Sequence, residues 1–230
     1  MINRRHIRVK VMQSVYALFK SNSDDLTKEE KFLNSSINKL YDLYGLILRL
    51  LVEVKNMEKK HIQISQKKLL ATSEDLNPNT KYIENQLIKL IENSSSLNNY
   101  LSLKNLNYWI LDDEYVSEIW KRVKKSDSYS SYMNSKSLSF QSDKEFVIAI
   151  FKEIIAPNDK LADYLEDKSI SWVDDIPFVN TWIVKTLNQV KPNGIFELGK
   201  LYKDDDDKQF ALDLFRKTVL NHPDYELIIT

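Results

Sequence analysis

The chain has 230 residues, and its 33 basic and 33 acidic side chains give a formal net charge of zero at pH 7. With 43% apolar and 29% charged residues it can bury a core, and it is too hydrophobic for a disordered chain. The absence of cysteine excludes disulfides and thiolate zinc sites. We expect a cytoplasmic location, because no stretch has the length and apolarity of a membrane span or the pattern of a signal peptide.

Helical spacing of apolar residues runs through the sequence, and we predict an all-α fold. Only three glycines and five prolines occur, and no Asn-Gly or Asp-Gly turn separates alternating runs, so a β-sheet is not expected. The spacing predicts a first helix that ends near Ser21. Its expected buried face carries Ile7, Val11, Val15, Leu18 and Phe19.

A long second helix is predicted from Thr27 to about Lys60. Thr27 and Glu30 have the spacing of a capping box, in which each side chain accepts a hydrogen bond from the other residue's backbone. Apolar residues recur at helical spacing from there to Val54. Gly45 is the point at which this helix is expected to bend.

Shorter helices are predicted in the middle of the chain. The segment 77–80 opens one of them, and the apolar residues of 116–123 mark another. The serine-rich stretches 93–99 and 126–142 lack a strong period and are predicted to be loops or frayed helix.

The last third of the sequence carries clear start and stop signals. Ser142–Glu145 has capping-box spacing and is predicted to start a helix that Pro157 ends, after which Asn158 caps the next one. A further helix is expected over 175–190. The carboxylates of Asp204–Asp207 favour the N-terminus of a last helix, because they suit the positive end of its dipole.

A basic cluster precedes the first acidic residue, Asp24. On a helical wheel of about 100° per residue, Arg8 falls inside the predicted apolar stripe, whereas His6 and Lys10 fall on the opposite side. A nucleic-acid role would therefore need the residues before Ile7 to form an extended arm. The alternative is a solvated basic terminus in which Arg8 makes a structural ion pair, and the spacing does not decide between the two.

Signals of catalysis are missing from the sequence. It contains no HExxH pattern, no glycine-rich phosphate loop, no nucleophile elbow and only three scattered histidines. We therefore predict that the protein is not an enzyme and has no metal and no cofactor. A second basic cluster beside an aromatic, Trp120–Lys125, is interpreted as a solvated helix end rather than a nucleic-acid site.

Two segments resemble the NusB transcription antitermination family. Arg4–Tyr16 is similar to the opening of the family's first helix, with its Arg-rich start and V-Q-x-L-Y-like run, and Asp207–Val219 is similar to the family's D-x-x-F/Y-x-x-x-L-x-x-x-V helix. The resemblance divides the chain into NusB-like N-terminal helices at 1–61, a helical insertion at 62–171 like that of the long Bacteroidetes variant, and truncated NusB-like helices at 172–230.

This resemblance implies a helical bundle that binds a boxA-type element of ribosomal RNA transcripts together with NusE, a ribosomal protein, in an RNA polymerase antitermination complex. The expected RNA-binding residues are Arg4, Arg5, His6 and Arg8, with Lys10 added because it lies near the first turn. The family continues with a second helical half, and no such segment follows Thr230, so NusE binding is the weaker expectation.

Two other interpretations remain. The many Tyr and Trp residues also suit a non-enzymatic helical protein-interaction module without RNA affinity. The NusB-like domain of a ribosomal RNA methyltransferase ranks last, because the sequence has no cofactor-binding segment.

Overall fold

The structure, a computed structural model, describes residues 1–21, 25–192 and 194–221, and all regular secondary structure in these ranges is helical. The all-α prediction is therefore confirmed. None of the described helices combines the length and the apolarity that a bilayer crossing requires.

Contacts between residues divide the chain into two compact units. The first combines Met1–Tyr41 with Gly199–Thr230, and the second is Asp42–Leu198. These two units differ from the three predicted segments, whose boundaries follow residues 61 and 171. The contacts split the long second helix and join its start to the C-terminal helix.

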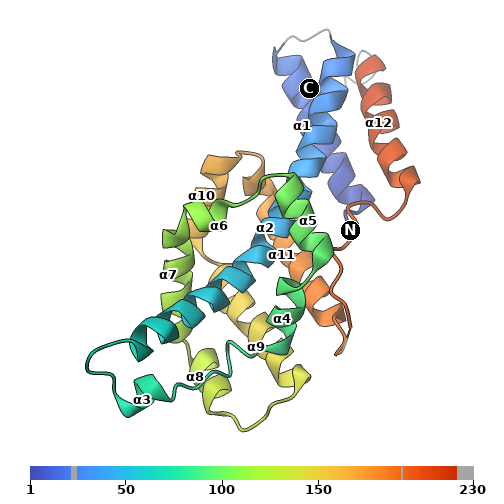
Figure 1. The fold of residues 1–230 in the computed structure, drawn as a ribbon. Helices are drawn as coiled ribbons and strands as arrows, with labels where there is room; N and C mark the ends of the chain where they lie inside the picture. Colours follow the sequence, from blue (N-terminus) through green and yellow to red (C-terminus); the bar gives the residue numbers. More distant parts are fainter. Residues whose placement is uncertain (22–24, 193, 222–230) are drawn as a thin grey trace. The chain divides into compact units, whose positions relative to one another are not determined.

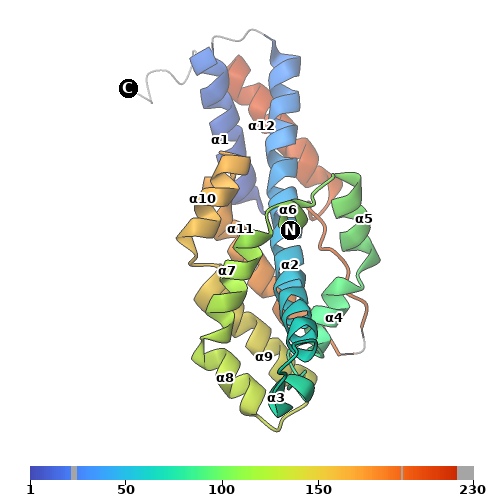
Figure 2. The ribbon, with the colours of Figure 1, turned by 60° about the vertical axis from the view of Figure 1, so that its left-hand side comes forward.

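The first unit contains three helical segments that lie side by side (Figures 1 and 2). They are α1 (Arg4–Ser21), the beginning of α2 (Leu26–Gln66) and α12 (Asp205–Leu220). Helices α1 and α12 pack against each other. The Arg216 side chain of α12 donates two hydrogen bonds to the Glu30 carboxylate of α2, and these bonds hold the pKa of Glu30 below its usual value.

The buried face of α1 differs from the predicted one. Val15 is only half-buried and Phe19 is exposed, whereas the polar residues Lys10 and Ser14 are buried. The stripe therefore follows i, i+3, i+4, i+7 and i+11 spacing from its first member and is rotated away from Arg8. Its members are Ile7, Lys10, Val11, Ser14 and Leu18.

The second unit is built around the later part of α2. From residue 43 to 54 almost every side chain of this helix is buried, which is the pattern of a helix surrounded by others. Tyr44 stacks on Trp182 of α11 with ring centroids 4.0 Å apart, and its hydroxyl lies 2.9 Å from that of Thr186. The surrounding elements are α3 (Ser73–Leu76), α4 (Gln86–Glu92), α5 (Ser95–Leu103), α6 (Tyr108–Leu111), α7 (Asp113–Lys124), α8 (Asp127–Asn134), α9 (Phe140–Ile150), the π-helical segment η1 (Phe151–Ile155), α10 (Asp159–Lys168) and α11 (Trp172–Gln189).

Two predicted capping boxes are wrong, and in both cases an earlier residue caps the helix. The backbone N–H of Lys28 donates to the Asp25 carboxylate, so α2 begins before Thr27. Helix α9 begins with Ser139 as its cap rather than at Ser142. The predicted cap at Asn158 is confirmed, because its side chain accepts from the backbone of Leu161.

Two stretches predicted to be loops or frayed helix contain formed helices. Helix α5 occupies most of 93–99 and α8 lies inside 126–142. Ser94 and Ser126 act as N-caps, each accepting a hydrogen bond from a backbone N–H of the first turn. Serine therefore starts these helices, although a run of serines weakens any apolar period.

Candidate nucleic-acid interface

The basic residues of the N-terminus lie on the first two turns of α1. The Asn3 side chain accepts a hydrogen bond from the backbone N–H of His6, and the Asn3 carbonyl accepts one from Ile7. The helix therefore begins at Arg4, so the extended arm that a nucleic-acid role was expected to need is not formed, and such a role has to use side chains on one face of the helix.

The residues before the helix are anchored to the first unit. Ile2 is buried, and its backbone N–H donates to the Leu201 carbonyl at 2.8 Å. This fixes the start of α1 on both sides of Asn3, so its first turn presents side chains from a defined backbone.

Two guanidinium groups share one aromatic ring. The Arg4 and Arg8 guanidinium carbons lie 5.0 and 5.5 Å from the ring centroid of Phe210 in α12. Arg4 also pairs with the Asp207 carboxylate at 3.1 Å, yet its side chain stays 57% exposed. Arg8 is exposed and makes no ion pair with any described residue, so the structure does not support the alternative in which Arg8 forms a structural ion pair.

Lys10 was predicted to bind RNA, and its position in the structure contradicts that prediction. It belongs to the buried stripe of α1 and is only 2% exposed. Lysine can be buried in this way because its long apolar stem packs like an aliphatic side chain. An ammonium group enclosed by the fold cannot contact a phosphate strand, and Lys10 is therefore removed from the candidate surface.

Arg5 and His6 differ in the charge that they bring. Arg5 is exposed and makes no ion pair with a described residue. The His6 ring lies 2.8 Å from the Asn3 side-chain oxygen, and burial, followed by the nearby charge of Arg5, lowers the pKa of His6. His6 is therefore neutral at pH 7 and offers hydrogen bonding rather than charge.

Acidic residues at the start of α12 lie beside the basic cluster of α1. Asp204 caps α12 by accepting from the backbone N–H of Asp207, and Asp207 is the carboxylate that pairs with Arg4. The predicted N-terminal position of Asp204–Asp207 is confirmed, but it brings a negative charge onto one edge of the basic cluster. Of the three arginines Arg4, Arg5 and Arg8, the last two make no ion pair with a described residue.

Apolar residues on the outer side of α1 were not identified from the sequence. Val9, Met12 and Tyr16 are exposed, and the last two are each 64% accessible to solvent. On a helical wheel they fall on the same side as Arg5, opposite the buried stripe. The wheel contained this signal, because any large apolar residue outside the buried face must meet solvent or a partner.

Three residues of the second basic cluster, Trp120–Lys125, make intramolecular contacts. Trp120 donates from its indole N–H to the buried Glu58 carboxylate at 2.6 Å, and Lys124 pairs with the same group at 3.0 Å. Arg122 pairs with Glu118 one turn earlier. Lys121, Arg122 and Lys125 are exposed, as expected for the predicted solvated helix end.

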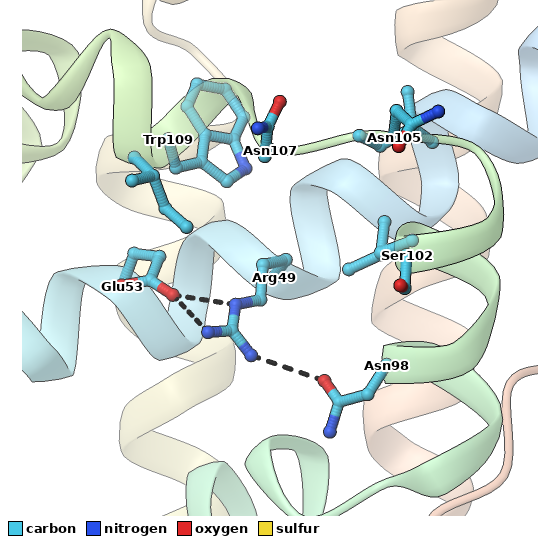
Figure 3. A pocket seen from close by; sticks show the side chains of 10 residues that line it. Arg49, Glu53, Asn98, Ser102, Asn105, Asn107 and Trp109 are labelled. Atoms are coloured by element: carbon cyan, nitrogen blue, oxygen red, sulfur yellow. Dashed lines mark hydrogen bonds and ion pairs between the residues drawn. The ribbon is translucent and has the colours of Figure 1, made fainter.

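A pocket of about 280 Å³ lies in the second unit, between α2 and the α5–α6 region (Figure 3). The Arg49 guanidinium in it donates to Glu53 at 2.7 Å and to the Asn98 side-chain oxygen at 3.3 Å, and the indole N–H of Trp109 donates to the Leu46 carbonyl. Its charged groups are therefore already paired with each other.

One strained residue at this pocket also has a structural cause. Asn105 has a positive φ of 53°. It follows α5, and the backbone N–H groups of Asn105 and Leu106 donate to the carbonyls of Ser102 and Leu101. This is the Schellman termination of a helix, for which a left-handed Asn is suited. The strain therefore caps α5 and does not itself indicate a ligand.

Comparisons of the chain with protein-family models, with curated proteins and with solved structures found no match. The geometry by itself defines an all-helical protein in which one helix presents basic and apolar side chains together on an exposed face.

Proposed function

We propose that this chain is a non-enzymatic RNA-binding protein that holds a single strand on α1, as a NusB-like factor would hold a boxA-type element of ribosomal RNA transcripts. The observation that supports the proposal is the outer face of α1, where the exposed Arg5 and Arg8 side chains accompany Met12 and Tyr16. The NusB resemblance supplies the kind of RNA.

The side chains of this face suit the chemistry of a single strand. A guanidinium group binds phosphate oxygens through two parallel N–H donors, and contact with the Phe210 ring restrains Arg8 before any RNA arrives. A base of a single strand stacks on an exposed aromatic such as Tyr16. Arg5 and Tyr16 are about 16 Å apart along the helix axis, which leaves room for more than one nucleotide.

The direct test replaces both unpaired arginines, as Arg5→Ala with Arg8→Ala. We expect the affinity for a boxA-type RNA to fall about tenfold or more, because two charge-assisted contacts to phosphates are lost. Fluorescence anisotropy with a labelled RNA measures the effect.

A matched control removes the same amount of charge elsewhere. Lys121 and Lys125 are exposed at the end of α7, and the double change Lys121→Ala with Lys125→Ala should leave the affinity within about twofold. An equal loss in both double variants would mean that net charge, rather than the surface of α1, governs binding.

Asp207 provides a test in the opposite direction. Asp207→Asn replaces the carboxylate beside Arg4 with a neutral amide of nearly the same shape. We therefore expect the RNA affinity to rise about two- to fivefold. The same anisotropy titration measures it, and thermal unfolding by circular dichroism confirms that α12 is still formed. An affinity that stays the same or falls would place the RNA away from Arg4.

The resemblance extends the proposal to partners. A NusB-like factor would act in the cytoplasm with NusE and with RNA polymerase. We propose both partners on that resemblance alone, and a binding experiment with boxA-type RNA in the presence and absence of NusE tests them.

A second candidate function is a helical protein-interaction module. The exposed Val9, Met12 and Tyr16 side chains favour it, because an apolar helix face rimmed by charge also suits a protein partner. A partner that stays bound after nuclease treatment, together with no measurable RNA affinity, would select this function over the first.

A further inference from the structure

The second unit carries exposed aliphatic side chains in the segment that ends α2 and follows it. It lies in the segment 59–76, here called the tip, which comprises the last turns of α2, the connection that follows it and the short helix α3 (Figure 1). Leu69 is 100% exposed and Leu70 is 88% exposed, and Ile64 and Leu76 are exposed beside them in the chain. Two adjacent leucines almost entirely in water are unfavourable for a protein that has no partner for them.

Several polar groups of the tip are bonded within it, so the turn that carries the leucines is held in a defined conformation. Thr72 and Asp75 form a reciprocal capping box, with both hydrogen bonds at 3.1 Å. The backbone N–H groups of Lys67 and Lys68 donate back to the last turn of α2. The exposure of Leu69 and Leu70 therefore belongs to a formed turn.

Exposed positive charge occurs in the same segment as these leucines. The exposed lysines of the tip are Lys59, Lys60, Lys67 and Lys68. The acidic residues of the tip are Glu74 and Asp75. The Asp75 carboxylate accepts a hydrogen bond from the Thr72 hydroxyl and lies 3.6 Å from the Lys68 ammonium. The acidic residue nearest before the tip, Glu58, is buried and accepts hydrogen bonds from inside the unit. The surface of the tip is therefore basic and aliphatic together.

We propose that the tip is a peripheral docking site for an anionic membrane surface. Lysines next to exposed aliphatic side chains match a bilayer that carries acidic headgroups above hydrocarbon. A nucleic acid would satisfy the lysines but offers no apolar medium to Leu69 and Leu70. A bilayer accepts protruding side chains without a groove of matching shape.

The geometry sets the depth of this contact. Between Gln66 and Ser73 the backbone is not helical, so those of its N–H and C=O groups that are not bonded within the tip need water or headgroups as partners. The leucine side chains enter the interface while the backbone of the tip stays at headgroup level. Such a contact differs from a membrane span and is independent of the RNA-binding proposal.

Vesicle co-sedimentation of the full chain tests the proposal. We expect binding to vesicles of phosphatidylcholine with about 30% phosphatidylserine, weakening as salt is raised, and at least tenfold less binding to pure phosphatidylcholine. The double change Leu69→Ser with Leu70→Ser should reduce binding to the anionic vesicles by about tenfold or more. Replacement of Lys59, Lys60 and Lys67 by glutamine should reduce it to a similar extent.

Matched controls separate this site from the rest of the surface. Leu103 and Leu138 are also highly exposed in the second unit, and their double change to serine should leave vesicle binding unchanged. The Arg5→Ala with Arg8→Ala variant should bind vesicles as the wild type does, whereas the Leu69 and Leu70 variant should bind RNA as the wild type does. Failure of one proposal is thus distinguishable from failure of the other.

Three results would overturn the membrane proposal. They are a wild-type chain that does not bind the anionic vesicles, equal binding to neutral and anionic vesicles, and unchanged binding after the leucine substitutions. Far-ultraviolet circular dichroism of each variant confirms that the helices are intact, and both leucines are exposed, so their replacement should leave the fold unchanged.

Discussion

Phe215→Ala is expected to lower the free energy of unfolding by about 3–5 kcal/mol. The Phe215 ring is fully buried in α12, within the unit that also contains α1. Replacing it with a methyl group removes its burial and leaves a cavity that the small three-helix unit can only partly fill. Urea unfolding followed by circular dichroism measures the change.

Leu220→Ala provides the control on the same helix. Leu220 is exposed, so the change should cost no more than about 0.5 kcal/mol. A Phe215→Ala variant as stable as this control would mean that the ring does not stabilise the first unit.

Glu58→Ala should destabilise the second unit by about 3 kcal/mol, because it removes the acceptor at the centre of a buried polar cluster. The Glu58 carboxylate accepts hydrogen bonds from the Trp120 indole at 2.6 Å, from Lys124 at 3.0 Å and from the Tyr129 hydroxyl at 3.2 Å. Burial and the charge of Glu58 both raise the pKa of Tyr129, so its hydroxyl stays protonated and continues to donate.

Glu58→Gln separates the loss of the hydrogen-bond acceptor from the loss of the negative charge. The amide keeps an acceptor for one or two donors and loses the negative charge opposite Lys124, so we expect a loss of about half that of the alanine variant. The urea midpoints of both variants provide the comparison. Equal stability of wild type and Glu58→Ala would contradict the stabilising role of this cluster.

The sequence was sufficient to predict the fold class and several helix ends. Scarce glycine and helical spacing indicated an all-helical chain, and the cap at Asn158 and the helix N-terminus at Asp204–Asp207 are local features that do not depend on distant residues. The wrong starts of α2 and α9 have one cause: several Ser, Thr and Asp residues in succession can each cap a helix, and local spacing alone does not select among them.

The face of α1 could not be predicted, because burial depends on neighbours from distant parts of the chain. The apolar residues of α1 cover a wide arc of the helical wheel, and the sequence pattern placed Arg8 inside it. In the structure Lys10 and Ser14 are buried instead. A small serine permits close helix packing and the stem of a lysine packs like an aliphatic chain, so neither residue type identifies itself as buried.

The candidate surface was predicted in part. The sequence located Arg4, Arg5, His6 and Arg8, but the Asp207 and Phe210 contacts lie about 200 residues away in the chain and have no local signal. The division into two units depends on such long-range contacts as well. Met12 and Tyr16 could have been found, since the same helical wheel places them beside Arg5.

The most direct test of RNA binding by α1 is the salt dependence of affinity for a boxA-type single strand. With Arg4, Arg5 and Arg8 on phosphates, the logarithm of the binding constant should fall against the logarithm of the salt concentration with a slope of about −2. In the Arg5→Ala with Arg8→Ala variant the affinity should drop and the slope should shrink to about −0.7. A slope and an affinity that are the same in both proteins would show that RNA does not bind at this surface.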